Sequence, residues 1–286
     1  MTHAAAGVAS LPQMILRNPT GLAGALIVGG IILTAIFADH IVPYDPNALD
    51  VRGRLQGPSA AHLLGTDQLG RDLFSRAVMG GRVALQVALP AVFAALVVGM
   101  TLGMIAGFGP RWLDAAIMIF LDTIRSFPTV MFALAVVALT GPSLETVMFV
   151  VMATSMPTYG RVARTQTLSL RNSEFILAER SLGASTPRIL CFHVMPNIIG
   201  ILAVLAAMDI PAVIALEAGL SFLGMGVKPP TPSWGSLLKD GYALIRNTPW
   251  PIIAGGAPVI LATLGFTFFG EALRDFADPR TRGAGQ

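Results

Sequence analysis

The stretch FILAERSLGASTPRILCFHVMPN, residues 175–197, stands between two long apolar runs of the sequence. Its ionisable side chains are Glu179, Arg180, Arg188 and His193. Gly183 lies near its middle and is typical of a helix C-terminus, because glycine enters the left-handed conformation without steric cost. The stretch therefore predicts two helices joined by a glycine turn, in a chain that is apolar on both sides of them.

The ends of these two helices can also be predicted. Ser173 is placed to cap the first helix. Ser185 or Thr186 caps the second, and Pro187 suits its first position because the φ angle of proline is already helical. This second helix is expected to end by Met195, since the residue before a proline avoids the helical region.

The composition indicates an integral membrane protein. Hydrophobic residues make up 54% of the 286 residues and charged residues only 12%, with a mean hydropathy of +0.70, against roughly 25% charged residues in soluble domains. The pI near 9.5 comes from basic residues between apolar runs, which favours arginine-rich flanks of membrane spans over nucleic-acid binding. The single cysteine, Cys191, excludes an internal disulfide framework, and the first 20 residues lack the pattern of a cleavable signal peptide.

Apolar runs of about 20 residues are expected to cross the membrane as helices, because every backbone polar group must be paired inside the lipid. Six runs fit: residues 21–38, 83–108, 113–140, 144–160, 198–225 and 250–271. The predicted fold class is an all-α integral membrane protein with about six transmembrane helices.

Two segments outside these spans are long enough to have structure of their own. In residues 40–82, apolar side chains near helical spacing predict a helix lying along the membrane surface. These side chains are Leu69, Leu73, Phe74 and Val78, with Arg71, Asp72 and Arg76 elsewhere. Residues 227–250, VKPPTPSWGSLLKDGYALIRNTPW, are rich in proline and glycine and are expected to form turns.

Lysine and arginine are enriched on the cytoplasmic side of membrane proteins. With both termini in the cytoplasm, ten of these residues lie inside and eight outside, a weak bias toward that orientation. The predicted division is a cytoplasmic N-terminal segment (1–20), the first span with an extracytoplasmic segment (21–82), a five-helix core containing the loop 161–197 (83–273), and a cytoplasmic tail (274–286).

The loop 161–197 is either a surface cap of the bundle or a docking element for a soluble partner. Its sequence from residue 159 to 197 strongly resembles the cytoplasmic loop of the membrane subunits of binding-protein-dependent ABC importers, whose pattern is E-A-A, three residues, glycine, nine residues and I-x-L-P. The matching residues are Gly183, Met195 and Pro196. His193 replaces the isoleucine and Leu177-Ala178-Glu179 replaces E-A-A, and these departures resemble the peptide and nickel branch of the family.

Further stretches resemble the second, DppC/OppC-like permease of that branch. They are HLLGTDQLGRDLFSRAVMGGRVAL at residues 62–85, EAGLSFLGMGVKPPTPSWGSLL at 217–238 and GEALRDFADPR at 270–280. The resemblance extends from Arg17 to Arg282. It implies a type I ABC importer permease bundle in the cytoplasmic membrane of a prokaryote, with both termini and a coupling helix in the cytoplasm.

The resemblance also implies partners and a role for the loop. The implied coupling residues are Ala178, Glu179, Arg180, Ser181, Leu182, Gly183, Ala184, Ser185, Pro187 and Arg188. The implied partners are a paralogous second permease (DppB/OppB-like), one or two ATP-binding subunits that hold ATP and Mg, an extracytoplasmic substrate-binding protein and the lipid bilayer. The implied cargo is dipeptides or oligopeptides, with nickel complexes or glutathione-like peptides as alternatives.

Four charged residues inside the predicted spans are candidates for a translocation path, because an intramembrane charge is costly unless it is paired or faces water. Asp122 and Arg125 are three residues apart and share a helix face, which favours an ion pair between them. Asp209 and Glu217 lie on one broad side of the fifth span. Glu217 equally suits a structural hydrogen bond across helices and a contact with substrate.

The chain itself shows no catalytic pattern. It has no G-x-x-x-x-G-K-[ST] loop, no HExxH, no CxxC pair and no metal-ligand spacing among its four histidines. We therefore expect a non-catalytic subunit without a bound cofactor or metal. An ion-driven secondary transporter is a second hypothesis, disfavoured because no internal repeat is visible, and a membrane enzyme or assembly factor is a third.

Overall fold

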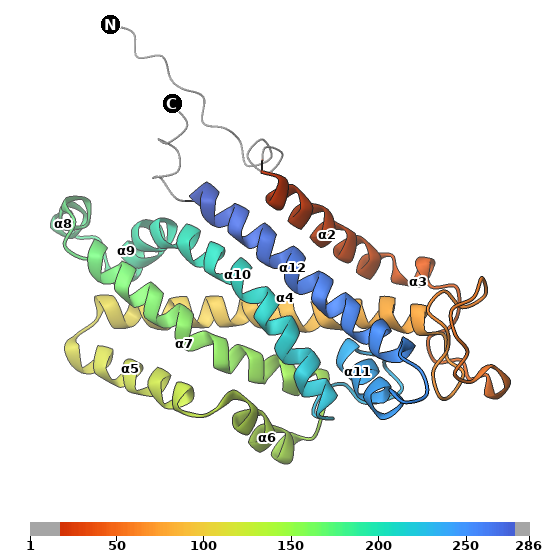
Figure 1. Cartoon of the computed structure of the whole chain (residues 1–286). Coiled ribbons are helices and arrows are strands. Elements are labelled where there is room, and N and C mark those ends of the chain that lie inside the picture. Colours follow the sequence, from red (N-terminus) through yellow and green to blue (C-terminus); the bar gives the residue numbers. More distant parts are fainter. Residues whose placement is uncertain (1–17, 278–286) are drawn as a thin grey trace, which may run out of the picture.

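The computed structural model describes residues 18–277, which are mostly helical (Figure 1). Most of the predicted N-terminal segment and of the predicted tail lies outside the described residues. The elements are α2 (Pro19–Ile36), α3 (Ala38–Ile41), the 3₁₀-helix η1 (Val51–Gly53), α4 (Leu73–Phe108), α5 (Arg111–Ser126), α6 (Thr129–Thr140), α7 (Leu144–Leu170), α8 (Glu174–Ser181), α9 (Thr186–Ile189), the π-helix η2 (Leu190–Val194), α10 (Met195–Phe222), α11 (Trp234–Ala243) and α12 (Trp250–Ala277). Within residues 18–277 the only β-pairing is an isolated bridge, so the all-α prediction is confirmed.

Four helical paths are long and apolar enough to cross a membrane: α2, α4, the continuous path from Thr186 to Phe222, and α12. The bent pair α5 and α6 makes a fifth. The remaining predicted span corresponds to α7, which has 27 residues but carries Glu145, Arg161 and Arg164 and is not among these apolar paths. Glu145 is exposed in the first turn of this helix, and Arg161 and Arg164 form ion pairs with aspartates of α5.

The span predicted at residues 113–140 is broken near its middle. α5 and α6 are separated by two residues, and their axes differ by 90°. Phe127 is extended, as expected for a residue that precedes a proline, and Pro128 has no N–H group to continue the helix. Irregular backbone at membrane depth is tolerated where it faces protein or water rather than lipid.

The central pair of the bundle is α4 and α7, and three glycines of α4 bring the two backbones together. The apolar part of α4 is 61% buried, against 22% for α2. Gly99, Gly103 and Gly107 recur every fourth residue and so lie on one helix face. A Cβ added to them would meet the carbonyl oxygens of Met156, Gly160 and Arg164 at 2.6, 2.3 and 2.9 Å, respectively. Small residues at this spacing are a known means of close helix packing in membranes.

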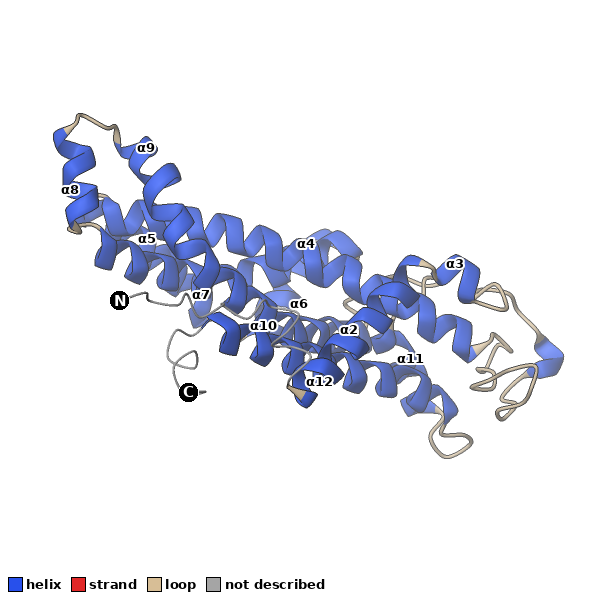
Figure 2. Cartoon of the chain, turned by 90° about the horizontal axis from the view of Figure 1, so that it is seen from above, coloured by secondary structure: helices blue, strands red, loops and turns tan. Residues whose placement is uncertain are grey.

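The outer pair, α2 and α12, runs antiparallel, with Gly21 against Ala272. Arg82 of α4 fixes the other end of α2, because its Nε donates to Ala35 O at 2.9 Å and its Nη2 lies 2.9 Å from Asp39 Oδ2. The hydrogen bond from Arg82 holds the pKa of Asp39 below its usual range. Because α2 and α12 run antiparallel, the start of α2 and the end of α12 lie at the same end of the bundle, which also carries α8 and α9 (Figures 1 and 2).

The prediction of a surface helix within residues 40–82 is wrong. Leu73, Phe74 and Val78 belong to the first turns of α4, which starts ten residues before the predicted span. Asp72 caps this helix, and its Oδ2 accepts a hydrogen bond from Ser75 N at 2.7 Å. The spacing of the apolar residues was helical because they start a membrane span rather than a separate helix.

Residues 42–72 instead form a compact loop at the end of the bundle opposite α8 and α9 (Figure 1). Gly65 and Gly70 both have a φ of +77°, which favours glycine. The backbone at Gly70 passes so close to Asp50 that an added Cβ would lie 1.7 Å from its carbonyl oxygen. Glycine is therefore required at this position for the loop to close.

The stretch 227–250 holds α11, a helix that the prediction of turns missed. Ser233 and Ser236 form a reciprocal capping box at its start, with bonds of 3.0 and 3.1 Å. Trp234 is buried, and its Nε1 donates to Ala77 O of α4 at 2.8 Å. These contacts hold α11 against the start of α4.

Replacing Gly103 by alanine is expected to destabilise the protein by about 1–3 kcal/mol, because the new methyl group overpacks the α4–α7 contact. Thermal unfolding of the detergent-solubilised protein measures this as a lower Tm. Gly200→Ala is the matched control, since an added Cβ there meets nothing within 4 Å. An equal change in Tm for the two variants would contradict the role assigned to the α4 glycines.

Candidate functional site

α8, the turn at Gly183 and α9 together form a knob, residues 174–189, at one end of the bundle (Figures 1 and 2). Two apolar side chains fasten it: Ile176 and Ile189 are only 0% and 1% exposed. In contrast, Leu182, next to the turn, is 82% exposed. Leu182 is therefore open to a partner at the end of the knob.

Gly183 ends α8 with the geometry predicted from the sequence. Its φ is +83°, and an added Cβ would meet nothing within 4 Å. The N–H groups of Gly183 and Ala184 donate to Arg180 O and Glu179 O, each at 3.0 Å, which is the Schellman pattern of helix termination. Glycine is therefore favoured here by backbone conformation, while the space around it is open to a partner.

The predicted caps are right in position but not in detail. Ser173 and Ser185 occupy the N-cap positions of α8 and α9, yet neither side chain bonds to its helix. The Oγ of Ser173 donates instead to Leu170 O of α7 at 2.7 Å. Thr186 is the first residue of α9, so Pro187 takes its second position rather than the predicted first.

The second helix of the knob does not end at Met195, contrary to the prediction. The π-helix η2 follows α9 without a break, and the N–H of Met195 donates to Leu190 O, five residues back. Pro196 then lies in the first turn of α10. The wider turn accommodates the proline, and Asn197 Nδ2 donates to His193 O at 2.6 Å. A helical path therefore runs from the knob directly into a membrane span.

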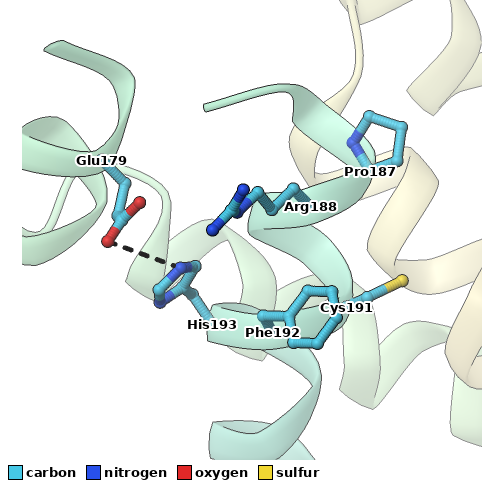
Figure 3. A pocket seen from close by; sticks show the side chains of 6 residues that line it. All are labelled: Glu179, Pro187, Arg188, Cys191, Phe192 and His193. Atoms are coloured by element: carbon cyan, nitrogen blue, oxygen red, sulfur yellow. Dashed lines mark ion pairs between the residues drawn. The ribbon is translucent and has the colours of Figure 1, made fainter. Parts of the chain in front are cut away.

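Two side-chain contacts of predicted coupling residues hold the knob to its surroundings. The guanidinium of Arg180 lies 4.5 Å from the ring centre of Phe108, at the end of α4. Glu179 Oε1 lies 3.6 Å from His193 Nε2 (Figure 3). Each contact is worth about 1 kcal/mol or less at an exposed position, so the buried isoleucines remain the principal anchors.

An open hollow of about 720 Å³ lies beside the knob, between α8 and the start of the helical path into α10 (Figure 3). Its lining residues are Glu179, Pro187, Arg188, Cys191, Phe192 and His193. Phe192 is 72% exposed, a further large apolar side chain open at this end of the molecule. The structure thus brings all ten predicted coupling residues together, exposed except for the half-buried Glu179 and Ala184.

The predicted ion pair between Asp122 and Arg125 does not form. Asp122 pairs across helices with Arg161 of α7. Arg125 forms no ion pair among the described residues and lines a polar hollow of about 270 Å³ next to the α5–α6 break. Its neighbours there include Thr129, Thr154 and Thr158.

Asp209 and Glu217 do not share a solvent-facing surface in the chain as described. Asp209 accepts a hydrogen bond from the buried Tyr159 of α7 at 2.9 Å. Glu217 is 0% exposed and accepts from Ser221, one turn along its own helix, at 2.7 Å. The hydrogen bond of Glu217 is thus within its own helix and not across helices.

Sequence reasoning missed the polar pairs that join α5 to α7. Besides Asp122 and Arg161, Arg164 Nη2 lies 2.6 Å from Asp114 Oδ2. From the sequence, Arg161 and Arg164 were used only to predict the orientation of the chain in the membrane. Their i, i+3 spacing on α7, and the spacing of Asp114 and Asp122 by two helical turns, were the available signals.

No group of three or more histidine, cysteine, aspartate or glutamate side chains within residues 18–277 is arranged to hold a metal ion.

The model of the family described as "Binding-protein-dependent transport system inner membrane component" matches residues 99–283, well over half of the sequence. The chain belongs to this family. A second model, "N-terminal TM domain of oligopeptide transport permease C", matches residues 13–58. The resemblance read from the coupling loop is therefore confirmed, as is the place of the chain among the permeases of ABC importers.

Curated relatives in the family match this permease over most of its length. The dipeptide transport system permease protein DppC of Alkalihalophilus pseudofirmus is 38% identical, with 94% of this chain and 89% of the relative covered. The di/tripeptide transport system permease protein DppC of Pseudomonas aeruginosa is 35% identical, with 95% and 92% covered. The glutathione transport system permease protein GsiD of Pectobacterium atrosepticum is 37% identical, with 94% and 90% covered.

The fold is also that of a solved ABC importer. A chain from inward-facing structures of the MetNI methionine ABC transporter superposes with a TM-score of 0.58 at 17% sequence identity. The match covers 70% of this chain and 96% of the other. The predicted type I permease fold is therefore confirmed.

Ile176→Ala is expected to loosen the knob, because removing a fully buried isoleucine side chain costs about 2–5 kcal/mol. Hydrogen exchange of the amides in α8 measures the loosening as faster exchange. Leu177→Ala is the matched control, since Leu177 is 47% exposed. Unchanged α8 exchange in Ile176→Ala would show that the anchor lies elsewhere.

Proposed function

We propose that this permease passes dipeptides or oligopeptides across the cytoplasmic membrane, and that separate ATP-hydrolysing subunits drive it through the knob. The observation that carries the proposal is the exposed turn at Gly183, fixed by Ile176 and Ile189 and continuous with a membrane span. Relatives named for dipeptide and di/tripeptide transport support the choice of peptides. A glutathione-like peptide is a second candidate cargo, favoured by the relative named for glutathione.

The proposed partners follow from what this chain offers and what it lacks. A second permease and lipid would cover exposed apolar side chains such as Trp112, Leu139 and Phe93, which are 71%, 88% and 67% exposed. One or two ATP-binding subunits would supply ATP, Mg and the phosphate-binding loop that this sequence does not contain. An extracytoplasmic binding protein would deliver the peptide to the opposite end of the bundle.

The proposed orientation places the knob and both termini in the cytoplasm. The geometry in its favour is that the start of α2 and the end of α12 lie at the same end of the bundle as the knob (Figure 1).

The proposed coupling residues are the ten on the knob, and their roles differ. Leu182 and Gly183 would enter the cleft of the ATPase, since both are exposed at the turn. Arg180 and Glu179 would set the angle of the knob through Phe108 and His193. Movement of the ATPase would then reach the membrane through the continuous helix that starts at Thr186.

We place the translocation path near Arg125 and Asp122, at the break between α5 and α6. A charge beside an irregular backbone and a polar hollow favours contact with water or a polar cargo. Asp209 and Glu217 would not contact the cargo but would hold α10 in position, because both are hydrogen-bonded within the protein.

Gly183→Arg is expected to leave the protein inserted and folded but to abolish peptide uptake. The arginine fits the open space at a conformational cost of about 1–2 kcal/mol, and it blocks the ATPase cleft. Uptake and co-purification of the ATPase subunits are the measurements. An ion-driven transporter would keep its uptake in this variant.

Gly141→Arg is the matched control for that variant. Gly141 also has a positive φ, +82°, and open space around an added Cβ, and its ψ of 163° makes a side chain at least as costly there as at Gly183. It lies between α6 and α7, away from the knob. It is expected to retain the ATPase subunits. Loss of the ATPases in both variants would point to general misfolding and not to a docking site.

Arg125→Gln is expected to slow peptide uptake several-fold without loss of the ATPase subunits, because the variant removes the charge from the polar hollow. Arg125→Lys, which keeps the charge, should restore part of the rate. Uptake by reconstituted importer is the measurement, and a full rate for Arg125→Gln would exclude this placement of the path.

A further inference from the structure

A second hollow, of about 360 Å³, lies at the end of the bundle opposite the knob. The end of α10, the turn that follows it, α11, the start of α4 and the loop 42–72 together line it, and the α6–α7 turn contributes Pro142. Its volume falls in the range of small-molecule sites. We name it the basic hollow, after the residues Arg71, Arg76, Lys228 and Lys239 that line it.

The two arginines are built into the wall of the basic hollow. Arg71 is 7% exposed and Arg76 is 2% exposed. Arg71 Nε lies 2.6 Å from Asp67 Oδ2, while Arg76 Nε lies 3.7 Å from the same oxygen, beyond hydrogen-bond range. The Nε of Arg76 is buried and has no hydrogen-bond partner. A buried guanidinium nitrogen left unbonded is costly and calls for an acceptor.

The two lysines stand over the same hollow from different elements. Lys228 lies on the turn after α10 and Lys239 on α11, and neither forms an ion pair with a carboxylate in residues 18–277. Lys239 Nζ lies 3.0 Å from the position of a Cβ added to Gly224, which places the ammonium over the turn. Both lysines are exposed, so they are accessible to an arriving ligand.

The charges in and behind the basic hollow do not balance. Asp240 lines it, with Oδ2 3.8 Å from Arg71 Nη2, and the buried Asp67 stands behind the arginines. Four cations against these two carboxylates leave an excess of positive charge. An anion that enters the hollow would meet cations from four segments at once, which favours a carboxylate ligand.

We propose that the basic hollow receives the free carboxylate of a peptide as the peptide leaves the extracytoplasmic binding protein. The proposal rests on the proposed function and adds the chemical group by which the permease holds its cargo. A small ligand is favoured over a docking protein because the arginines form the buried wall of a concave site. Holding the carboxylate there lowers the chance that the peptide returns to the binding protein, and so raises the rate of transport.

The test uses the complete importer in proteoliposomes, with its binding protein loaded with alanyl-alanine. Lys228→Gln combined with Lys239→Gln is expected to lower the maximal uptake rate about tenfold. The concentration of binding protein that gives half-maximal uptake should stay unchanged. Arg246→Gln is the matched control, since Arg246 is an exposed cation between α11 and α12 that does not line the hollow.

A direct binding measurement separates the carboxylate from the rest of the peptide. The importer without binding protein should bind alanyl-alanine more tightly than its C-terminal amide, and the double lysine variant should lose this preference. Equal binding of the two peptides by the wild type would overturn the proposal.

The remaining outcomes are also decisive. If the double variant raises the half-saturating concentration of binding protein at an unchanged maximal rate, the lysines dock the binding protein and the carboxylate site is excluded. A wild-type rate in the double variant likewise overturns it. Absence of alanyl-alanine uptake by the wild type would contradict the proposed function itself.

Discussion

The close contact between α4 and α7 is the constraint on which the rest of the molecule depends. Lipid is as apolar as a leucine side chain, so helices in a membrane are held together by tight packing and polar contacts rather than by the hydrophobic effect. Gly99, Gly103 and Gly107 provide that packing over two helical turns. Because α7 leads directly into the knob, its position on α4 also sets where the knob stands.

The same contact explains why α7 is more polar than a membrane span usually is. Surrounded by α4, α5 and α10, it directs Arg161 and Arg164 toward Asp122 and Asp114 of α5, and Tyr159 toward Asp209 of α10. Such pairs between helices specify which helices neighbour each other, because a wrong neighbour would leave a charge unpaired. Glycines thus determine how close the helices come, and polar pairs determine their register.

The sequence predicted the features that depend on local chemistry. The left-handed glycine at Gly183, the cap positions and the apolar spans follow from rules that act within a few residues. It did not predict features that depend on neighbours distant in sequence. The first turns of α4 resembled a surface helix because residues 69–78 carry no sign that α11 covers them. Asp122 pairs with Arg161, 39 residues away in the sequence, and not with Arg125 on its own helix. The helix does not end before Pro196, because the wider π-helical turn that precedes the proline accommodates it.

A single helical path links the two proposed sites. From Thr186 to Phe222 it has 37 residues, which corresponds to about 55 Å at the rise of an α-helix. One of its ends belongs to the knob, and the other borders the basic hollow through Ser221. Movement at one end of this path reaches the other end as long as the path stays stiff at its two weak points, the π-turn at Leu190–Val194 and Pro211 inside α10. Glu217 and Ser221, which are bonded to each other, lie beyond both points, near the end of α10. The helical path thus connects the knob to the site where we place the arriving peptide.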